Sequence, residues 1–339
     1  MKRFTLLILS AALALMTGCT TDEAATGPGT DGGTEDQKVT FRLRIPGGQT
    51  PSGTRAANVD DTVSAVDILL FDASGTFAGH GYGTGISVSQ ENSDPAKATF
   101  TVLLTPGTYS VVVVANARDR INTLLGTDRR GLDGESKADI LAALTYTFSS
   151  ATGWNIASRP IPMYGETASA VTIQSGMSEV PLTLRRMASR IDVKVSTADF
   201  TLGKIHLVNY NTAGYIAPKW DASGSIVSPA PTTPWLPAAP GAQTGTDNAI
   251  AYNVGGATTY ENLIYTFEAA AASEATLATA PCLIFEGTYG GDTYFYRADF
   301  TYAGDPTDPA FDPAAVAYMP LLRNHKYVVE IASATGPGY

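Results

Sequence analysis

The chain has 339 residues, a formal net charge of −10 and a pI of about 4.8. A chain this acidic argues against a nucleic-acid partner, which would need a basic face to neutralise phosphates. Apolar residues make up 44% of the sequence and charged residues 16%, a balance typical of a β-rich extracellular protein. The length exceeds the common size of one domain, so two domains are expected.

The N-terminus has the pattern of an export signal. Lys2 and Arg3 precede an apolar run over 4–16 that is too short to span a bilayer comfortably as a helix. The run ends in LMTGC, which resembles the lipobox at which lipoprotein signal peptidase cuts. This resemblance implies a signal peptide over 1–18 and lipidation, with palmitate among the acyl chains, at Cys19. A free thiol beside an ordinary cleavage site is the alternative.

A flexible tether is predicted over 19–37, which contains several acids and no large apolar side chain. Its Asp22 and Glu23 resemble the acidic signal that directs bacterial lipoproteins to the cell surface, and a solvated acidic linker is the alternative. The only other cysteine is Cys282, so a lipidated Cys19 leaves no pair for an intramolecular disulfide. Cys282 is expected to be a small buried side chain.

Alternation of apolar and polar residues dominates the chain. In KVTFRLRI, the side chains of Val39, Phe41, Leu43 and Ile45 share one face, which predicts a half-buried strand over 38–45. Further strands rich in Val, Ile, Tyr and Phe are predicted at 63–72, 97–104, 107–117, 170–174, 179–186, 189–197, 202–211, 262–269, 281–289, 293–302 and 325–333. The pattern predicts an all-β protein built from β-sandwiches.

One short helix is predicted in the N-terminal half, over 135–148. Ser136 and Asp139 resemble a capping box, and an apolar stripe follows them. The halves of the chain also repeat each other weakly, because KVTFRLRI and RIDVKVST are each followed by a gap and a second strand. The repeat places a boundary near residue 187 and predicts two tandem sandwich domains, 38–187 and 188–339.

No catalytic, cofactor-binding or metal-binding motif stands out. His80, His206 and His325 lie on separate segments with no cysteine or carboxylate at ligand spacing, so they are expected to be strand or surface residues. GHGYGTG over 79–85 lacks the spacing of a phosphate-binding loop and is interpreted as an ordinary loop. The sequence therefore predicts neither an enzyme nor a cofactor or metal site.

Two loops leave alternatives open. Asp305, Asp308 and Asp312 could hold calcium, but the loop lacks the alternating ligands and terminal glutamate of an EF-hand, which favours a Pro-stiffened acidic loop. Trp235 lies in a proline-rich loop, where it could stack on a sugar or contact another protein. A tryptophan folded back onto its own domain is the simpler interpretation.

Several motifs, in order along both halves, resemble the Bacteroidales fimbrillin family of FimA and Mfa type lipoproteins. They are the lipobox, VDILLFDASG, TPGTYSVVVVANA, PIPMYGE, LTLRRMASRIDVKV, YTFEAAAA with LIFEGTY, and LLRNHKYVVEI. The resemblance implies two tandem transthyretin-like β-sandwiches in a major or minor fimbrial subunit of the outer membrane or cell surface. It also implies maturation by an arginine-specific protease that removes the first strand.

Arg55 lies where that cut would fall, in the linker after KVTFRLRI. Cleavage between Arg55 and Ala56 would make 38–55 a removable strand and linker, and would uncover the apolar groove that the strand fills. A strand from a neighbouring subunit could then restore the ladder, and repeated donor-strand exchange would build a fibre. An incidental linker arginine is the alternative.

The sequence thus predicts a structural subunit of a surface fimbria that supports adhesion. Its expected partners are other fimbrial subunits, the maturation protease and the outer membrane through the Cys19 lipid, with a host protein or glycan as a further candidate. The alternative is a monomeric surface lipoprotein that binds glycans or host proteins through its loops and keeps 38–45 for life. Because little sequence follows 325–333, the chain is expected to accept a strand more readily than to donate one. Three explanations stay open: a terminal or accessory subunit, a truncated sequence, or exchange of 325–333 itself.

Overall fold

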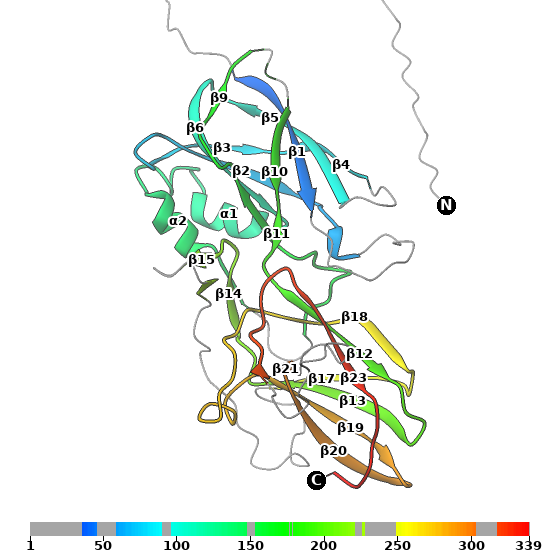
Figure 1. Ribbon diagram of the computed structural model, residues 1–339. Coiled ribbons are helices and arrows are strands. Elements are labelled where there is room, and N and C mark those ends of the chain that lie inside the picture. The colour runs from blue at the N-terminus through cyan, green and yellow to red at the C-terminus, as the bar shows by residue number, and fades with distance from the viewer. Residues whose placement is uncertain are drawn as a thin grey trace, which may run out of the picture. The chain divides into compact units, whose positions relative to one another are not determined.

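The computed structural model describes residues 36–45, 59–89, 96–147, 153–175, 177, 179–220, 226–227, 249–302 and 317–338. The chain divides into two units, Met1–Thr34 and Glu35–Tyr339, and every described residue belongs to the second. This second unit contains two tandem β-sandwiches (Figure 1). The all-β fold class is therefore confirmed, while the domain limits at 187 and 188 stay a prediction.

The first sheet of the N-terminal sandwich has the strand order β10-β1-β5-β4 (Figure 1). Its strands are β1 (Gln37–Ile45), β4 (Thr84–Ser89), β5 (Ala96–Leu104) and β10 (Glu179–Thr183). β1 runs antiparallel to β5 and parallel to β10. The earliest strand of the chain is therefore an interior strand of its sheet.

The second sheet has the order β11-β8-β6-β2-β3, and β9 also pairs with β6. Its strands are β2 (Val66–Phe71), β3 (Phe77–Tyr82), β6 (Gly107–Ala115), β8 (Met163–Glu166), β9 (Val171–Ile173) and β11 (Arg185–Arg186). All six residues of β2 are buried because one face meets the first sheet and the other meets the helical layer. This double burial explains why β2 and the end of β6 are continuous apolar runs.

Two short helices, α1 (Arg118–Leu125) and α2 (Lys137–Ala143), cover the outer face of the second sheet (Figure 1). The Ser136 side chain caps α2 by accepting a hydrogen bond from the Asp139 amide, as the capping motif predicts. The predicted helix over 135–148 is too long, because β7 (Thr145–Thr147) replaces its end by pairing with β14 (Ala213–Tyr215). α1 is not predicted, because only Ile121 and Leu125 of its charged sequence are buried.

The interpretation of GHGYGTG as a loop is wrong, because these residues belong to β3 and β4. Gly81 and Gly83 are needed for close packing rather than for a turn. A Cβ on Gly81 would lie 2.5 Å from Val102, and a Cβ on Gly83 would lie 2.7 Å from the ring of Phe100. Strands with such glycines lack the β-branched residues by which strands are recognised in a sequence.

The C-terminal sandwich packs the sheet β18-β12-β23 against the sheet β17-β13-β19-β20. The first comprises β12 (Ser189–Val195), β18 (Thr259–Thr266) and β23 (Lys326–Ile331). The second comprises β13 (Phe200–Val208), β17 (Ala249–Asn253), β19 (Cys282–Tyr289) and β20 (Asp292–Asp299). Two minor pairs join β15 (Lys219–Trp220) to β16 (Ile226–Val227) and β21 (Thr301–Tyr302) to β22 (Ala317–Tyr318).

The first strands of the two sandwiches have equivalent partners. β12 runs antiparallel to β18 and parallel to β23, just as β1 runs antiparallel to β5 and parallel to β10. The weak repeat between KVTFRLRI and RIDVKVST therefore corresponds to a repeated pairing pattern.

A buried ionic cluster joins the 3-10 helix η1 (Val59–Asp61) to the C-terminal half of the chain. Arg190 Nη1 lies 3.1 Å from Oδ2 of Asp60, and the Tyr265 hydroxyl donates a hydrogen bond to the other carboxylate oxygen, Oδ1. Arg186 pairs with Asp61 and donates from Nε to the backbone oxygen of Asp60 at 2.8 Å. All five side chains are buried. Ionic contacts of this kind bind η1 to residues more than a hundred positions away.

The cluster continues along β12 through Asp192. Arg190 donates to both carboxylate oxygens of Asp192 at 2.7 Å, and Lys326 Nζ lies 2.9 Å from one of them. Burial would raise the pKa of Asp192, but Arg190 and Lys326 hold that pKa below its usual value. The cluster therefore contains three cations and three anions, and each of its charges has a partner.

We expect Asp60→Asn to destabilise the protein by about 3 kcal/mol, because removing one member of a buried pair leaves a desolvated charge behind. Glu179→Gln is the matched control, since it breaks the exposed Arg42 pair, which contributes at most about 1 kcal/mol. Urea unfolding followed by circular dichroism measures both changes. Equal midpoints for the two variants would contradict the structural role of the cluster.

Stability should fall at acidic pH in a way that depends on Asp192. Its folded pKa is depressed, so it contributes stability above its unfolded pKa, and this contribution is lost as pH falls through the folded pKa. We expect the unfolding free energy to decline below about pH 4, and to decline less steeply in Asp192→Asn. Urea titrations at several pH values test this, and parallel pH profiles for the two proteins would refute it.

Candidate functional site

The candidate site is β1 together with the groove that holds it. Val39, Phe41, Leu43 and Ile45 all have 0% exposure, so the apolar face predicted from the sequence is fully buried. Between them, polar side chains point to solvent or are half-buried, and Arg42 and Arg44 are exposed. Strict alternation thus gives β1 one dry face and one wet face.

The apolar face of β1 meets different side chains along its length. On β5, Val39 faces Val102, Phe41 faces Phe100, Leu43 faces Ala98 and Ile45 faces Ala96, while Val180 and Leu182 of β10 adjoin Phe41 and Leu43. The rings of Phe41 and Phe100 stack with centroids 5.2 Å apart and an interplanar angle of 6°. The β5 side of the groove therefore has an aromatic ring near its middle and small side chains toward the end of β1.

Hydrogen-bonded neighbours flank β1 on both edges. All nine of its residues are in register with β5, and five of them with β10. β10 ends the sheet, and its Pro181 has no N–H to donate to a further strand. β1 therefore cannot leave the sheet without breaking a hydrogen-bond ladder on each of its two sides.

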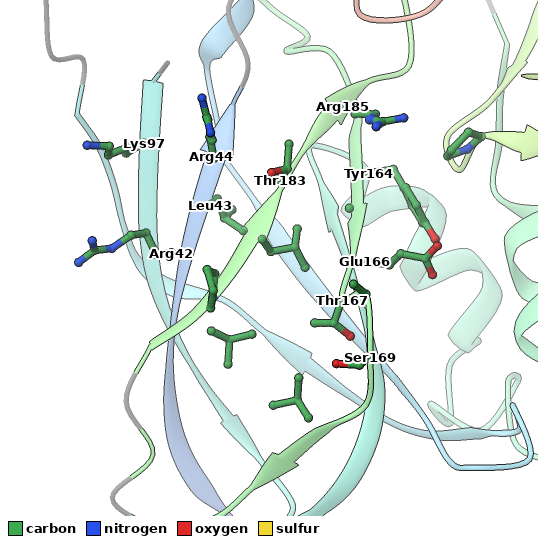
Figure 2. A pocket seen from close by; sticks show the side chains of 17 residues that line it. Arg42, Leu43, Arg44, Lys97, Tyr164, Glu166, Thr167, Ser169, Thr183 and Arg185 are labelled. Atoms are coloured by element: carbon green, nitrogen blue, oxygen red, sulfur yellow. The ribbon is translucent and has the colours of Figure 1, made fainter. Parts of the chain in front are cut away.

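A cavity of about 910 Å³ lies beside β10. Figure 2 shows Arg42, Arg44 and Lys97 on the β1 side of β10, and Tyr164 and Glu166 of β8 on the other. Glu166 pairs with Lys137, and burial, reinforced by Glu166, raises the pKa of Tyr164. The cavity is thus lined from both sheets of the N-terminal sandwich, by residues of β1, β5, β8 and β10.

Several predicted residues lie outside the part of the chain that the structure describes. These are Cys19, Arg55, Ala56, Trp235 and the aspartates at 305, 308 and 312. Their predicted roles stay predictions.

The three histidines, which the sequence predicts to be strand or surface residues, lie in or beside strands. His80 of β3 contacts Asp67 at 3.1 Å and His206 of β13 contacts Glu286 at 3.0 Å. Among the described residues, no group of three or more His, Cys, Asp or Glu side chains is placed to hold a metal ion. Cys282 is buried, as predicted, and its burial raises the pKa of the thiol to about 12. In the described part of the chain, no helix is both long and apolar enough to cross a bilayer.

The sequence profile of the fimbrillin-A associated anchor proteins Mfa1 and Mfa2 matches residues 31–324. The chain belongs to this family. Family membership confirms the fimbrillin resemblance and supports a structural role in a fimbria at the cell surface. No curated protein sequence matches the chain.

One solved structure of a fimbrial protein shares the fold, and two others align more weakly. The tip fimbrial protein Mfa3 from Porphyromonas gingivalis, with a C-terminal truncation, aligns with a TM-score of 0.57 and 18% identity over 88% of this chain and 96% of its own. A fimbrial assembly protein from Parabacteroides distasonis aligns at 0.49 with 16% identity, covering 87% and 92%. The fimbrial anchor protein Mfa2 from P. gingivalis aligns at 0.34 with 12% identity, covering 86% and 100%. The family and these neighbours are fimbrial proteins rather than enzymes.

Sequence reasoning did not identify the partners of β1. The alternation within residues 38–45 predicts which side chains are buried, but β10 follows more than a hundred residues later and pairs in parallel. No local signal connects two strands that far apart. Pro181, an imino acid within a strand pattern, is the one clue that β10 lies at an edge.

We expect Leu43→Ala to lower the free energy of unfolding by about 2–5 kcal/mol, because it leaves a cavity between Ala98 and Leu182. Arg44→Ala is the matched control, since its exposed side chain should change stability by at most about 0.5 kcal/mol. Urea unfolding of the uncleaved chain measures both. A negligible loss in Leu43→Ala would show that β1 is not part of the folded core.

Proposed function

We propose that this protein is a structural subunit of a surface fimbria that polymerises by donor-strand exchange and thereby supports adhesion. An arginine-specific protease would cut between Arg55 and Ala56, and β1 would then be replaced by a strand from another subunit. The observation that carries this proposal is the position of β1, an interior strand at the start of the chain with a fully buried apolar face. Membership of a fimbrial family supports it.

Loss of β1 would leave a gap that the folded protein cannot close by itself. Its four buried apolar side chains contribute on the order of 6–12 kcal/mol, an upper figure that omits chain entropy. Its departure would also leave unpaired backbone groups along β5 and β10. Such unpaired edges can bind a replacement strand, and one subunit filling the next gives an open-ended assembly.

The 3-10 helix η1, which follows Arg55 in the sequence, is held in place. η1 begins at Val59, and the buried ion pairs of Asp60 and Asp61 bind it to Arg186 and Arg190. A cut at Arg55 would therefore free 38–55 while the new N-terminal segment stays attached to the body. The two sides of the cut differ in what retains them, since apolar burial holds β1 and buried ion pairs hold η1.

The proposed cut would also separate the protein from its lipid. Cys19 lies on the N-terminal side of Arg55, so lipid, tether and β1 would leave together. One cleavage would then release the subunit from the outer membrane and open its groove.

We expect an arginine-specific protease to cut the chain first after Arg55, and Arg55→Ala to abolish this first cut. The cut chain should keep β1 bound, because its apolar face stays buried, and should release it only in mild denaturant or with a competing strand. Mass spectrometry and gel filtration measure cutting and release. Should Arg55 resist while the folded body is cut, or the chain stripped of 1–55 stay monomeric and bind no strand, the proposal fails.

Lipidation at Cys19 is tested in the native cell. We expect Cys19→Ala to block signal-peptide processing and to move the protein from the detergent phase to the aqueous phase. Ser10→Ala, in the predicted signal peptide, is a control that should leave both unchanged. Unchanged partitioning of Cys19→Ala would refute the lipid anchor.

A further inference from the structure

We infer that the groove under β1 selects its replacement strand at one position, which requires an aromatic ring stacked on Phe100. The three other inward positions accept aliphatic side chains of varied shape, and the outward positions are permissive. This inference rests on the proposed strand exchange and names the chemistry of the partner strand. The required pattern is aliphatic, aromatic, aliphatic, aliphatic at alternate residues, in the places of Val39, Phe41, Leu43 and Ile45.

The aromatic requirement follows from the geometry around Phe100. Its ring lies parallel to that of Phe41 at a centroid distance of 5.2 Å, and its exposure is only 1%. Gly83 approaches Phe100 so closely that a Cβ there would lie 2.7 Å from the ring. The Phe100 ring is therefore held between backbone and Phe41. A flat side chain completes this stack, whereas a branched aliphatic one loses the ring contact and leaves space.

The remaining inward positions restrict the size of the side chain that they accept but not its shape. Leu43 and Ile45 face Ala98 and Ala96, whose short side chains leave depth on the β5 side of the groove. Leu182 of β10 borders the same region. Apolar contacts of this kind tolerate exchange between aliphatic side chains of similar volume.

The outward face contributes little selectivity. Arg42 forms an ion pair with Glu179 at 2.6 Å, but the side chains are 53% and 41% exposed. Solvent and salt weaken such pairs. A partner strand with a different charge at this position should therefore bind almost as well.

The test uses the chain cut after Arg55 and freed of β1 in mild denaturant, with fluorescent peptides of residues 36–46 as probes. We expect Phe41→Leu and Phe41→Met in the peptide to weaken binding about tenfold or more. The matched controls are Leu43→Ile, an inward change that keeps volume, and Arg42→Gln, an outward change. Both should alter affinity by less than about threefold.

A Phe100→Leu chain gives the reciprocal measurement, in which the preference for Phe41 over leucine in the peptide should shrink. If that chain does not fold, the peptide series on the unmodified groove decides alone. Equal binding of the Phe41 and leucine or methionine peptides would overturn the aromatic requirement while leaving strand exchange intact. Failure of the unmodified peptide itself to bind would overturn the exchange proposal and this inference together.

Discussion

The pairing of β1 on both of its edges is the constraint on which the N-terminal sandwich depends. β5 and β10 do not pair with each other, so β1 alone joins β10 to the rest of its sheet. Its apolar face also supplies four members of the core between the two sheets. One nine-residue strand therefore completes both the hydrogen-bond ladder and the packing. This is why its loss would leave a defined vacancy rather than a local fraying.

The equivalent strands of the two sandwiches differ in what lies on their outer faces. β12 carries Arg190 and Asp192, which are buried in the ionic cluster with Asp60. β1 carries the exposed Arg42 and Arg44 in corresponding outward positions. Removing β12 would leave buried charges without their partners. Removing β1 would break only exposed contacts on its outer face. Under the proposed exchange, the same pairing pattern would give one permanent strand, β12, and one replaceable strand, β1.

The ionic cluster also bears on where the proposed removable segment would end. η1 follows the linker directly, and its two aspartates lie among arginines of the C-terminal half. Buried pairs are strongly destabilising to break once formed, even where they add little net stability. The proposed strand exchange in the N-terminal sandwich would therefore leave the contacts of η1 intact.

Local pattern in the sequence was enough to predict the strands and faces that depend on neighbouring residues. Alternation in 38–45 gave the buried face of β1, and Ser136 with Asp139 gave the start of α2, because these signals act over a few positions. The glycine-bearing β3, the weakly apolar α1 and the strand β7 were missed, because tertiary packing and not propensity places them.

Only the tertiary structure decided which strands lie beside β1, which ring stacks on Phe41 and which arginines hold η1. Each of these contacts joins residues far apart in the chain, where a single sequence carries no record of proximity.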